Sequence, residues 1–528
     1  MRRTIWLSVF VIVFVWTAAA QPQIAADGVL NAASDALIGW PNSSIAQGSI
    51  FSIYGLNLGP SSSPALAYPL QTTLGGVSVQ VVSGSTTANA IPIFVGPDQV
   101  NAVLPGSTAS GSATITVTYN GQTSNTVSFQ VIANSFGIFT VGSTGYGTGI
   151  VTDANSQLYG VNSSAHPGDA ATIWGTGLGA SLGDDGSAPP QQIDMPNLPL
   201  SVYVGTQQAI VTYRGRSGFT GEDQINFVVP AGITGCYAPV ALEIGNVVSN
   251  FVTMPIAPAG QPCPDAAVPH PNSFTGNITL GRSIMIGSTT ITTDRSQAYF
   301  GNPQILAFPY VPPLFGNPYS LPAGTCTGGV TFPLIFDVLG TTLDAGPVIT
   351  ISGQNGSQQL LAPGYDTQLG GGSGTNPQPL YLSAGDYTVS GTGGTRTEAL
   401  ANAGPFSQKF TIPQPLTWTN QSNISTVDRS VSLDVIWTGG DPNGTVQIAG
   451  EVQIPGSVLS VVTFLCNVRT SDQHFTIPAF VLLSVSPSET STDTLWLSSI
   501  STTAFAAAGI SLGTINSIVT IEKDVIYH

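Results

Sequence analysis

The chain has 528 residues and a formal net charge of −16, with 11 basic and 27 acidic side chains. This acidic balance argues against nucleic acid as a partner. Charged residues make up only 7% of the chain, so its surface must consist largely of uncharged polar side chains and backbone. The 61 Gly and 39 Pro lie among short β-branched segments, which favours many short strands joined by turns over disorder.

Residues 1–20 have the pattern of a secretory signal peptide. Arg2 and Arg3 form a basic start, and an apolar run of 12 residues follows over 5–16. Because a membrane helix needs roughly 17 to 25 apolar residues, we expect cleavage after Ala20 and no membrane span afterwards. The alternative is an uncleaved anchor.

The chain contains four cysteines, and an even number in an exported protein predicts two disulfides. Four cysteines allow three connectivities. We favour Cys236 with Cys263, because they bracket one predicted domain end, and Cys326 with Cys466 then follows by elimination. Free buried thiols are the alternative. A zinc site is less favoured still, since no Cys-x-x-Cys motif or nearby His pair supplies its ligands.

Two stretches about 120 residues apart resemble each other. Each opens with a strand that runs into a Gly-rich turn, continues with a Gln-x-Asn-x-x-x-Pro motif, and reaches Ser-Asn 25 residues after the Gln. The matching positions are Gly48, Gly55, Gly59, Gln99, Asn101, Ser124 and Asn125 in the first copy, and Gly168, Gly175, Gly179, Gln224, Asn226, Ser249 and Asn250 in the second.

Between these positions apolar side chains occupy every second residue, as in 113–119 and 127–132. Period two predicts strands with one buried face, and several such strands in each copy predict an all-β, immunoglobulin-like sandwich. We expect one sandwich in residues 21–135 and a second in residues 136–257. Because the Gln and Asn amides repeat with the fold, we expect them to bond the backbone of the neighbouring loop rather than a ligand.

The Gly-x5-[Tyr/Trp]-Gly-x-x-Leu-Gly segments resemble the opening of IPT/TIG domains, the immunoglobulin-like fold of plexins and certain transcription factors. Residues 28–257 resemble more closely a paired module of many secreted acidobacterial proteins, the Solibacter uncharacterised C-terminal domain family. This resemblance implies an immunoglobulin-like fold and export, with no established activity or ligand. The module departs from the family's arrangement, because it precedes a long extension here. The resemblance rests on residues 31–34, 136–139, 145–147 and 249–250 and on both Gln-x-Asn motifs.

Residues 258–275 are rich in Pro and small residues and are predicted to be a linker. Residues 276–528 again show strand patterns, which predicts one or two further sandwiches with a possible break near residue 414. Asp441-Pro-Asn-Gly444 is a hairpin turn signal, and residues 504–510 are expected to form a short helix. The predicted strands are 330–338, 347–353, 386–391, 408–412, 430–437, 445–450, 461–465 and 475–483.

Several motifs match functional patterns without the surroundings that those patterns need. Residues 179–183 have the form of a Gly-x-Ser-x-Gly nucleophile motif around Ser181, but the Asp- and Pro-rich stretch after it cannot make the required helix. Residues 175–180 mimic a dinucleotide fingerprint outside any βαβ setting. The acidic loops 183–186 and 441–444 offer too few oxygens for Ca²⁺. We therefore predict no catalytic residue, cofactor or metal ligand, the scattered histidines included: His166, His270, His474 and His528.

We expect a secreted or cell-surface, non-catalytic protein whose sandwiches act as structural spacers and as interaction or adhesion modules. Its partner would be an extracellular protein or a glycan, and loops at the sandwich ends would make the contacts. Tyr146, Tyr213 and Phe219 are candidates to stack on sugars, with packing in the core as the alternative. A different hypothesis is an exported hydrolase with a β-sandwich catalytic domain in residues 276–528, where distant carboxylates converge.

Overall fold

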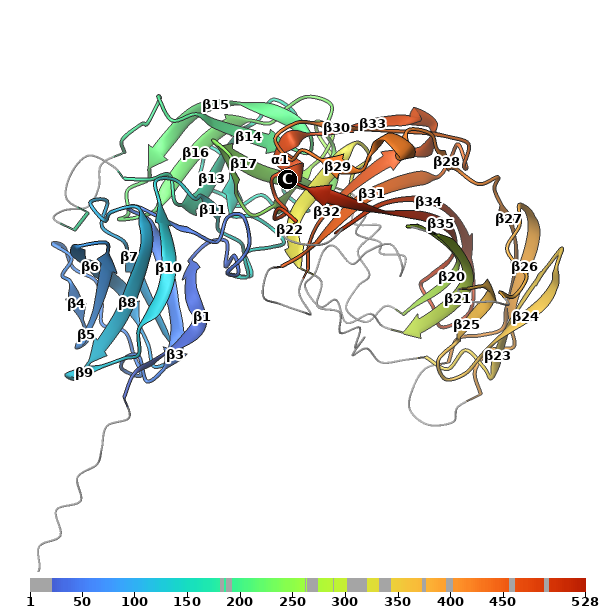
Figure 1. The fold of residues 1–528 in the computed structure, drawn as a ribbon, viewed down its shortest axis with the longest axis horizontal. Helices are drawn as coiled ribbons and strands as arrows, with labels where there is room; N and C mark the ends of the chain where they lie inside the picture. The colour runs from blue at the N-terminus through green and yellow to red at the C-terminus, as the bar shows by residue number, and fades with distance from the viewer. Residues whose placement is uncertain are drawn as a thin grey trace, which may run out of the picture.

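The computed structural model describes residues 21–180, 185–186, 192–261, 263, 274–287, 289–301, 321–331, 343–372, 377–395, 402–454, 461–488 and 493–528. The expected signal peptide and most of the predicted linker lie outside these residues. The described chain is almost entirely β, with tandem immunoglobulin-like sandwiches followed by a larger β unit. Figure 1 shows the first sandwich in blue, the second in green and the larger unit in yellow to red, arranged as an arch. No helix in the described residues is long and apolar enough to cross a membrane.

The first sandwich forms because its strands alternate inward and outward side chains. In β5 (Val77–Ser83), Val77, Val79 and Val81 are buried in the core. β6 (Thr86–Val95) joins the two halves of the sandwich, since it pairs first with β5 and then with β7. The other strands are β1 (Gln23–Asn31), β2 (Ile45–Ala46), β3 (Ile50–Leu56), β4 (Thr73–Leu74), β7 (Gln99–Val103), β8 (Gly111–Tyr119), β9 (Gln122–Thr123) and β10 (Val127–Ile132).

The second sandwich repeats this arrangement. β15 (Gln207–Arg216) again joins the two halves, since it pairs with β14 and then with β16. The strand order is β11-β13-β16-β15-β14-β17-β18, with β12 beside β13 and β19 beside β17. These strands are β11 (Gly137–Ile138), β12 (Val151–Thr152), β13 (Ala170–Thr176), β14 (Leu200–Val204), β16 (Asp223–Val228), β17 (Gly235–Ile244), β18 (Val247–Val248) and β19 (Val252–Ile256).

One sheet, here called the long sheet, organises the C-terminal unit. Its order is β22-β32-β31-β34-β35-β20-β21-β25, with β29 also beside β35. The possible break near residue 414 does not divide this sheet, because strands from both sides of that residue belong to it. Its strands are β20 (Thr275–Ile286), β21 (Thr290–Gly301), β22 (Thr325–Thr331), β25 (Asp366–Gly371), β29 (Thr426–Val427), β31 (Thr445–Gln453), β32 (Val461–Arg469), β34 (Asp493–Phe505) and β35 (Leu512–Tyr527).

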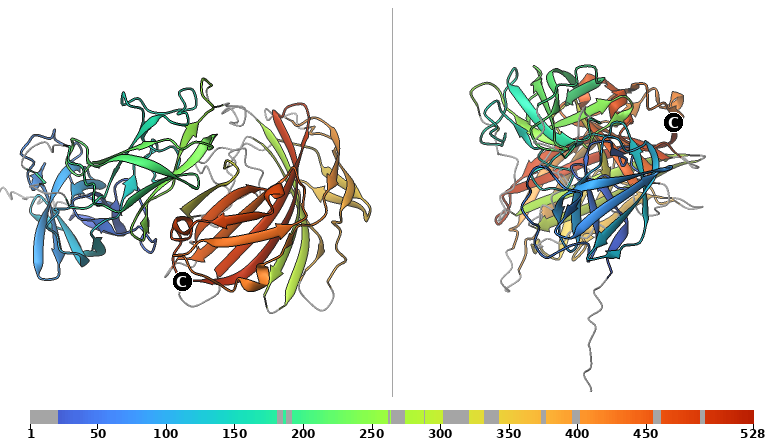
Figure 2. Two further views of the ribbon diagram at one scale, coloured as in Figure 1. Left: turned by 90° about the horizontal axis from the view of Figure 1, so that it is seen from above. Right: turned by 90° about the vertical axis from the view of Figure 1, so that its left-hand side faces the viewer.

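Two smaller sheets cover the apolar face of the long sheet. One packs around Ile278 and Ile515, and the other packs around Ile521 and Trp437. Ile515 and Ile521 lie on the same face of β35, because an even number of residues separates them. The smaller sheets lie outside the bend of the long sheet in Figure 1, and Figure 2 shows the long strands side by side. They comprise β23 (Val348–Gly353), β24 (Gly356–Leu361), β26 (Gly385–Gly391) and β27 (Phe406–Ile412), and then β28 (Thr417–Trp418), β30 (Leu433–Thr438) and β33 (His474–Ile477).

Local predictions in this unit are wrong at three places. Residues 441–444 do form a turn, but β30 and β31 on either side of it pair in different sheets and make no hairpin. The predicted strand 475–483 ends at Ile477, and the helix α1 (Ala479–Leu482) follows Pro478, which cannot donate a ladder hydrogen bond. Residues 504–510 end β34 and form a turn, since so short an apolar run does not sustain a helix by itself.

Candidate functional site

The repeated glycines allow strands to approach closely. A Cβ added to Gly55 would lie 2.0 Å from the Gln23 carbonyl oxygen, and one added to Gly175 would lie 2.2 Å from the Gly137 carbonyl oxygen. Both contacts join the same pair of strand positions in the two copies. Gly48 and Gly168 adopt positive φ of 73° and 92°, a region that favours glycine. Gly59 and Gly179 end the two Gly-rich turns.

The repeated Gln amides bond Asn side chains on their own strands, and not the loop backbone that the sequence led us to expect. The Gln99 amide donates to the Asn101 Oδ1 (2.8 Å), which also accepts from the Ser52 hydroxyl (3.1 Å). In the second copy Gln224 donates to Asn226 (2.8 Å), which accepts from Thr172 (3.1 Å). The same network in both copies supports a structural role for these amides.

The Ser-Asn pairs make the contacts that close each sandwich. The Asn125 side chain accepts from the Ile24 N–H (2.8 Å) and donates to the Ile24 carbonyl (3.0 Å). Asn250 makes the same two contacts with Ile138, at the same distances, and also donates to the Gly145 carbonyl (2.7 Å). Asn250 is buried, at 4% exposure, whereas Asn125 is exposed. The spacing of the two Ser-Asn pairs therefore reflects one structural requirement, met twice.

A buried ion pair lies where the two sandwiches meet. Arg216 and Asp223 are 3% and 0% exposed and form a salt bridge. The Asp223 carboxylate also accepts from the N–H groups of Gly177 and Leu178, both at 2.8 Å, and Arg216 donates to the Gly179 carbonyl. A Cβ added to Gly48 of the first sandwich would lie 2.6 Å from the Arg216 guanidinium. Sequence reasoning missed this pair. Two signals could have pointed to it: Asp223 directly precedes the repeated Gln224, and Arg216 is one of only 11 basic residues in the chain.

Further hydrogen bonds cross the same joint. Thr176 of the second sandwich accepts from the Ile50 N–H (2.8 Å) of the first, and the hydroxyls of Tyr68 and Thr220 share a hydrogen bond (3.0 Å). Close by, burial raises the pKa of Asp35 to about 6, while interaction with the Tyr54 hydroxyl lowers it. The joint therefore holds polar groups away from water.

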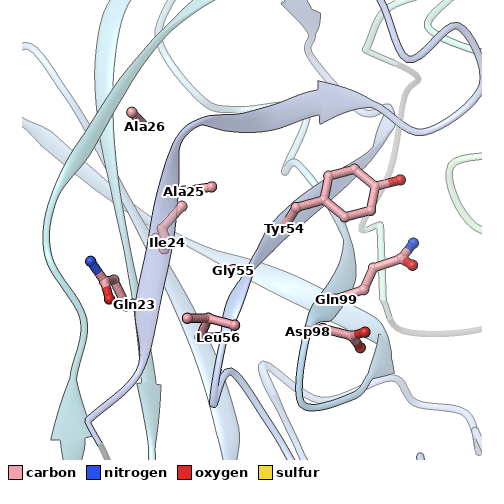
Figure 3. A pocket seen from close by; sticks show the side chains of 9 residues that line it. All are labelled: Gln23, Ile24, Ala25, Ala26, Tyr54, Gly55, Leu56, Asp98 and Gln99. Atoms are coloured by element: carbon pink, nitrogen blue, oxygen red, sulfur yellow. The ribbon is translucent and has the colours of Figure 1, made fainter.

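A shallow hollow of about 580 Å³ opens at the edge of the first sandwich (Figure 3). It forms because β1 bulges away from β3 between Ile24 and Val29. Tyr54, Asp98 and Gln99 line one side, and residues 23–26 line the other (Figure 3). In the second sandwich the corresponding strand is split into β11 and β12, which both pair with β13.

Aromatic side chains join the second sandwich to the C-terminal unit. The rings of Tyr203 in β14 and Phe480 in α1 stack with centroids 3.9 Å apart. Phe480 also stacks with Phe251 of the second sandwich, and the centroids of these two rings are 6.0 Å apart. Phe251 and Phe480 belong to one hydrophobic cluster that also contains Trp437 of the C-terminal unit. The second and third units thus share part of a core.

The structure contains the disulfide pairing that the sequence favoured. Cys236 bonds Cys263 at the end of the second sandwich, and Cys326 bonds Cys466 across β22 and β32 of the long sheet. Disulfides of this kind are typical of extracellular proteins.

The face of the long sheet opposite the smaller sheets, here called the inner face, is polar and bears two carboxyl groups. Glu451 of β31 and Glu522 of β35 are separated by β34. Burial raises the pKa of each, and the charge of Glu522 raises that of Glu451 further. Trp496 lies on the same face, directly opposite Glu522 in the pairing of β34 with β35. Sequence reasoning missed this face, because its residues come from strands that are far apart in the chain.

The remaining sequence candidates do not come together. Tyr146, Tyr213 and Phe219 are half-buried in loops and strands of the second sandwich, and the Tyr213 hydroxyl donates to the Arg216 carbonyl (2.6 Å). His166 bonds the Ala257 carbonyl, and His474 lies beside Asp434. Within the described residues, no group of three or more His, Cys, Asp or Glu could hold a metal ion. Ser181 and His270 lie outside the described residues.

Residues 40–131 match the IPT/TIG domain family. This match and the sheet topology establish an immunoglobulin-like module in the first sandwich, which the second repeats. No curated protein matches the chain.

The solved structures that match the chain share little sequence with it. Immunoglobulin domains 1–4 of Sidekick-1 are 10% identical, with a TM-score of 0.12, over 91% of this chain and 95% of theirs. SGBP-B of a Bacteroides ovatus mixed-linkage glucan utilization locus, in complex with a heptasaccharide, is 11% identical, with a TM-score of 0.14, over 88% and 96%. The gamma-CGTase of an alkalophilic Bacillus clarkii is 12% identical, with a TM-score of 0.17, over 46% of this chain and only 26% of the enzyme. Scores this low carry no argument about function.

Proposed function

We propose that this protein is exported and acts outside the cell as a non-catalytic, rigid spacer whose β modules contact an extracellular protein or a glycan. The observation that supports this most directly is the nature of its joints. The buried Arg216–Asp223 pair lies at the first joint, and the Tyr203–Phe480 stack lies at the second. Side chains fixed in this way restrict the domain motions that flexible linkers would allow.

The proposal includes the features that sequence patterns suggest and the structure leaves open. These features are the cleavage of a signal peptide at residues 1–20, a family relationship to the secreted acidobacterial module, and a division into domains at 21–135, 136–257 and 276–528. The two disulfides fit an oxidising compartment. The continuity of the long sheet across residue 414 supports treating 276–528 as one unit.

Small-angle X-ray scattering of the purified mature protein tests rigidity. We expect the wild-type curve to fit one shape with the arch of Figure 1. Phe480→Ala should widen the distance distribution, because it removes the stacked ring at the second joint. Leu361→Ala is the matched control, since Leu361 is 62% exposed on β24, away from that joint. A wild-type curve that only a broad ensemble of shapes can fit would contradict the proposal.

A second candidate function is hydrolysis by the C-terminal unit. Glu451 and Glu522 favour it, because two carboxyl groups on one face can act as general acid and general base, and burial raises the pKa of both. Their strands lie about 10 Å apart, since β34 separates them. Chromogenic glycosides and esters test this candidate directly. Turnover that disappears in Glu451→Gln and Glu522→Gln would replace the non-catalytic proposal.

A further inference from the structure

One face of the first sandwich carries two aromatic rings on either side of the Gln99–Asn101 pair. Tyr54 of β3 lies directly opposite Gln99 of β7, and Phe94 of β6 lies directly opposite Asn101. These side chains alternate with core residues such as Val100, so they lie on the outer face of the sheet. Because β7 separates β3 from β6, the strands that carry the two rings lie about 10 Å apart.

This outer face is open to solvent. Phe94 is 42% exposed, and Tyr54 and Gln99 are half-buried. Beside Tyr54 lies the hollow of about 580 Å³, whose other side is formed by residues 23–26 (Figure 3). Asp98, which also lines the hollow, is exposed. The volume is within the range of about 300 to 1,000 Å³ that is typical of small-molecule sites.

Two oxygen acceptors in the hollow are free to bond a ligand. Gln99 uses its Nε2 group to bond Asn101, and no hydrogen bond among the described residues uses its Oε1. None of the salt bridges within the described part of the chain includes Asp98. Gln23 is exposed on the other side of the hollow, and its amide can donate as well as accept. The hollow therefore offers both kinds of hydrogen-bonding group.

The two copies of the repeat use the carboxylate at the position of Asp98 differently. In the second copy Asp223 is fully buried and forms a salt bridge with Arg216. In the first copy Pro97 takes the register position of Arg216, so the strand that pairs with Arg216's counterpart supplies no cation. The carboxylate that stabilises the second sandwich is therefore left at the surface of the first.

The aromatic residue at the position of Tyr54 also differs in its surroundings. Its counterpart Trp174 donates its indole N–H to the Thr152 hydroxyl of β12 (2.9 Å). Residues 139–150 connect β11 to β12 beside Trp174, where the first copy has only the bulge at 25–28. The bulge that opens the hollow is thus a feature of the first copy.

The chemistry of this face selects a neutral sugar. An aromatic ring beside oxygen acceptors and an amide can contact the apolar side of a sugar ring and bond its hydroxyls. A peptide that adds to a sheet needs a free strand edge, but β3 and β7 are each paired on both sides. Asp98 and the net charge of −16 disfavour an anionic ligand.

We propose that the first sandwich binds a neutral glycan on this outer face, with one sugar ring in the hollow against Tyr54, a hydroxyl bonded to Asp98, and a further part of the glycan against Phe94. This inference rests on the proposed function, because it names the ligand class and the place of one interaction module. It is separate from rigidity, which concerns the joints.

Affinity electrophoresis of the full mature protein tests the inference, with one soluble polysaccharide in each gel and a gel without polysaccharide as the reference for mobility. The neutral probes are mixed-linkage β-glucan, arabinoxylan, galactomannan and dextran, and polygalacturonate is the anionic probe. We expect at least one neutral probe to retard the wild type, and polygalacturonate to leave it unretarded.

The variants change exposed residues, because replacing Tyr54 would also disturb Asp35. Asp98→Ala should weaken binding about tenfold, the loss that one hydrogen bond to a charged group accounts for. Phe94→Ala should weaken it about fivefold, since it removes one ring contact. Val82→Ala is the matched control and should bind as the wild type does, because Val82 is 37% exposed on β5 in the other half of the same sandwich. Melting curves of every variant check that it is folded.

Three results would overturn the inference: no neutral probe retards the wild type, only polygalacturonate does, or the folded Asp98 and Phe94 variants bind as tightly as the wild type. In the first case an extracellular protein remains as the partner in the proposed function. A scattering curve that only a broad ensemble of shapes can fit would contradict the rigid spacer and leave the glycan site standing.

Discussion

The two Ser-Asn pairs allow one hydrogen-bonding arrangement to be compared at two levels of burial within the same chain. Asn250→Ala removes the partners of the Ile138 N–H, the Ile138 carbonyl and the Gly145 carbonyl, at distances of 2.8, 3.0 and 2.7 Å. Asn250 is 4% exposed, so water does not readily replace it. Each buried group left without a partner costs about 1 to 3 kcal/mol, and relaxation reduces the sum. We expect a loss of about 3 to 5 kcal/mol in the free energy of unfolding of the second sandwich.

Asn125→Ala is the matched control. It removes the same two contacts with Ile24, but Asn125 is exposed and water can take its place. We expect a loss of about 1 kcal/mol or less in the first sandwich.

Urea unfolding of the full chain, with hydrogen exchange of the Ile138 and Ile24 segments as local readouts, measures both effects. Local exchange is needed because a chain of several units need not unfold in one step. Equal losses in the two variants, or faster exchange at Ile24 than at Ile138, would refute the argument from burial.

Three further predictions concern the ion pair, a carboxyl group and a disulfide. Asp223→Ala should destabilise the first joint by about 3 to 5 kcal/mol, measured by urea unfolding, because it leaves the Arg216 charge buried without a partner; a loss similar to that of an exposed Asp would contradict this. Asp35→Asn should leave stability unchanged near pH 4 and raise it by about 1 to 2 kcal/mol at pH 8, measured as melting temperature against pH. The sign follows because the pKa of Asp35 is raised to about 6, so the folded state favours the neutral acid. The stability of the wild type therefore falls as the pH rises from 4 through 6. A higher melting temperature of the variant at pH 4 would contradict this reasoning. Joint replacement of Cys326 and Cys466 by Ala should lower the free energy of unfolding by up to about 5 kcal/mol in the chain-entropy picture, since their sequence separation is 140; an unchanged urea midpoint would show that the bond adds nothing.

The repeat shows which structural features a local sequence pattern can identify. Gly55 and Gly175, and Asn125 and Asn250, are identifiable in the sequence because one backbone geometry recurs and requires the same residue each time. The sequence does not say which atoms the repeated amides bond. Gln99 and Gln224 donate to Asn101 and Asn226, because side chains two residues apart on one strand lie on the same face.

By itself the sequence determined the all-β class, the tandem immunoglobulin-like sandwiches and the favoured disulfide partners, since alternation, turn residues and paired cysteines act over short stretches or by count. Only the tertiary structure decided the rest. Residues 441–444 form a turn whose flanking strands separate into two sheets, and β20 pairs with β35 from the far end of the chain. Glu451, Trp496 and Glu522 share one face because of the register of three strands, and the Asp223 carboxylate meets the Gly177 and Leu178 N–H groups, which lie 46 and 45 residues away in the sequence. Register and docking depend on long-range packing, which no local pattern encodes.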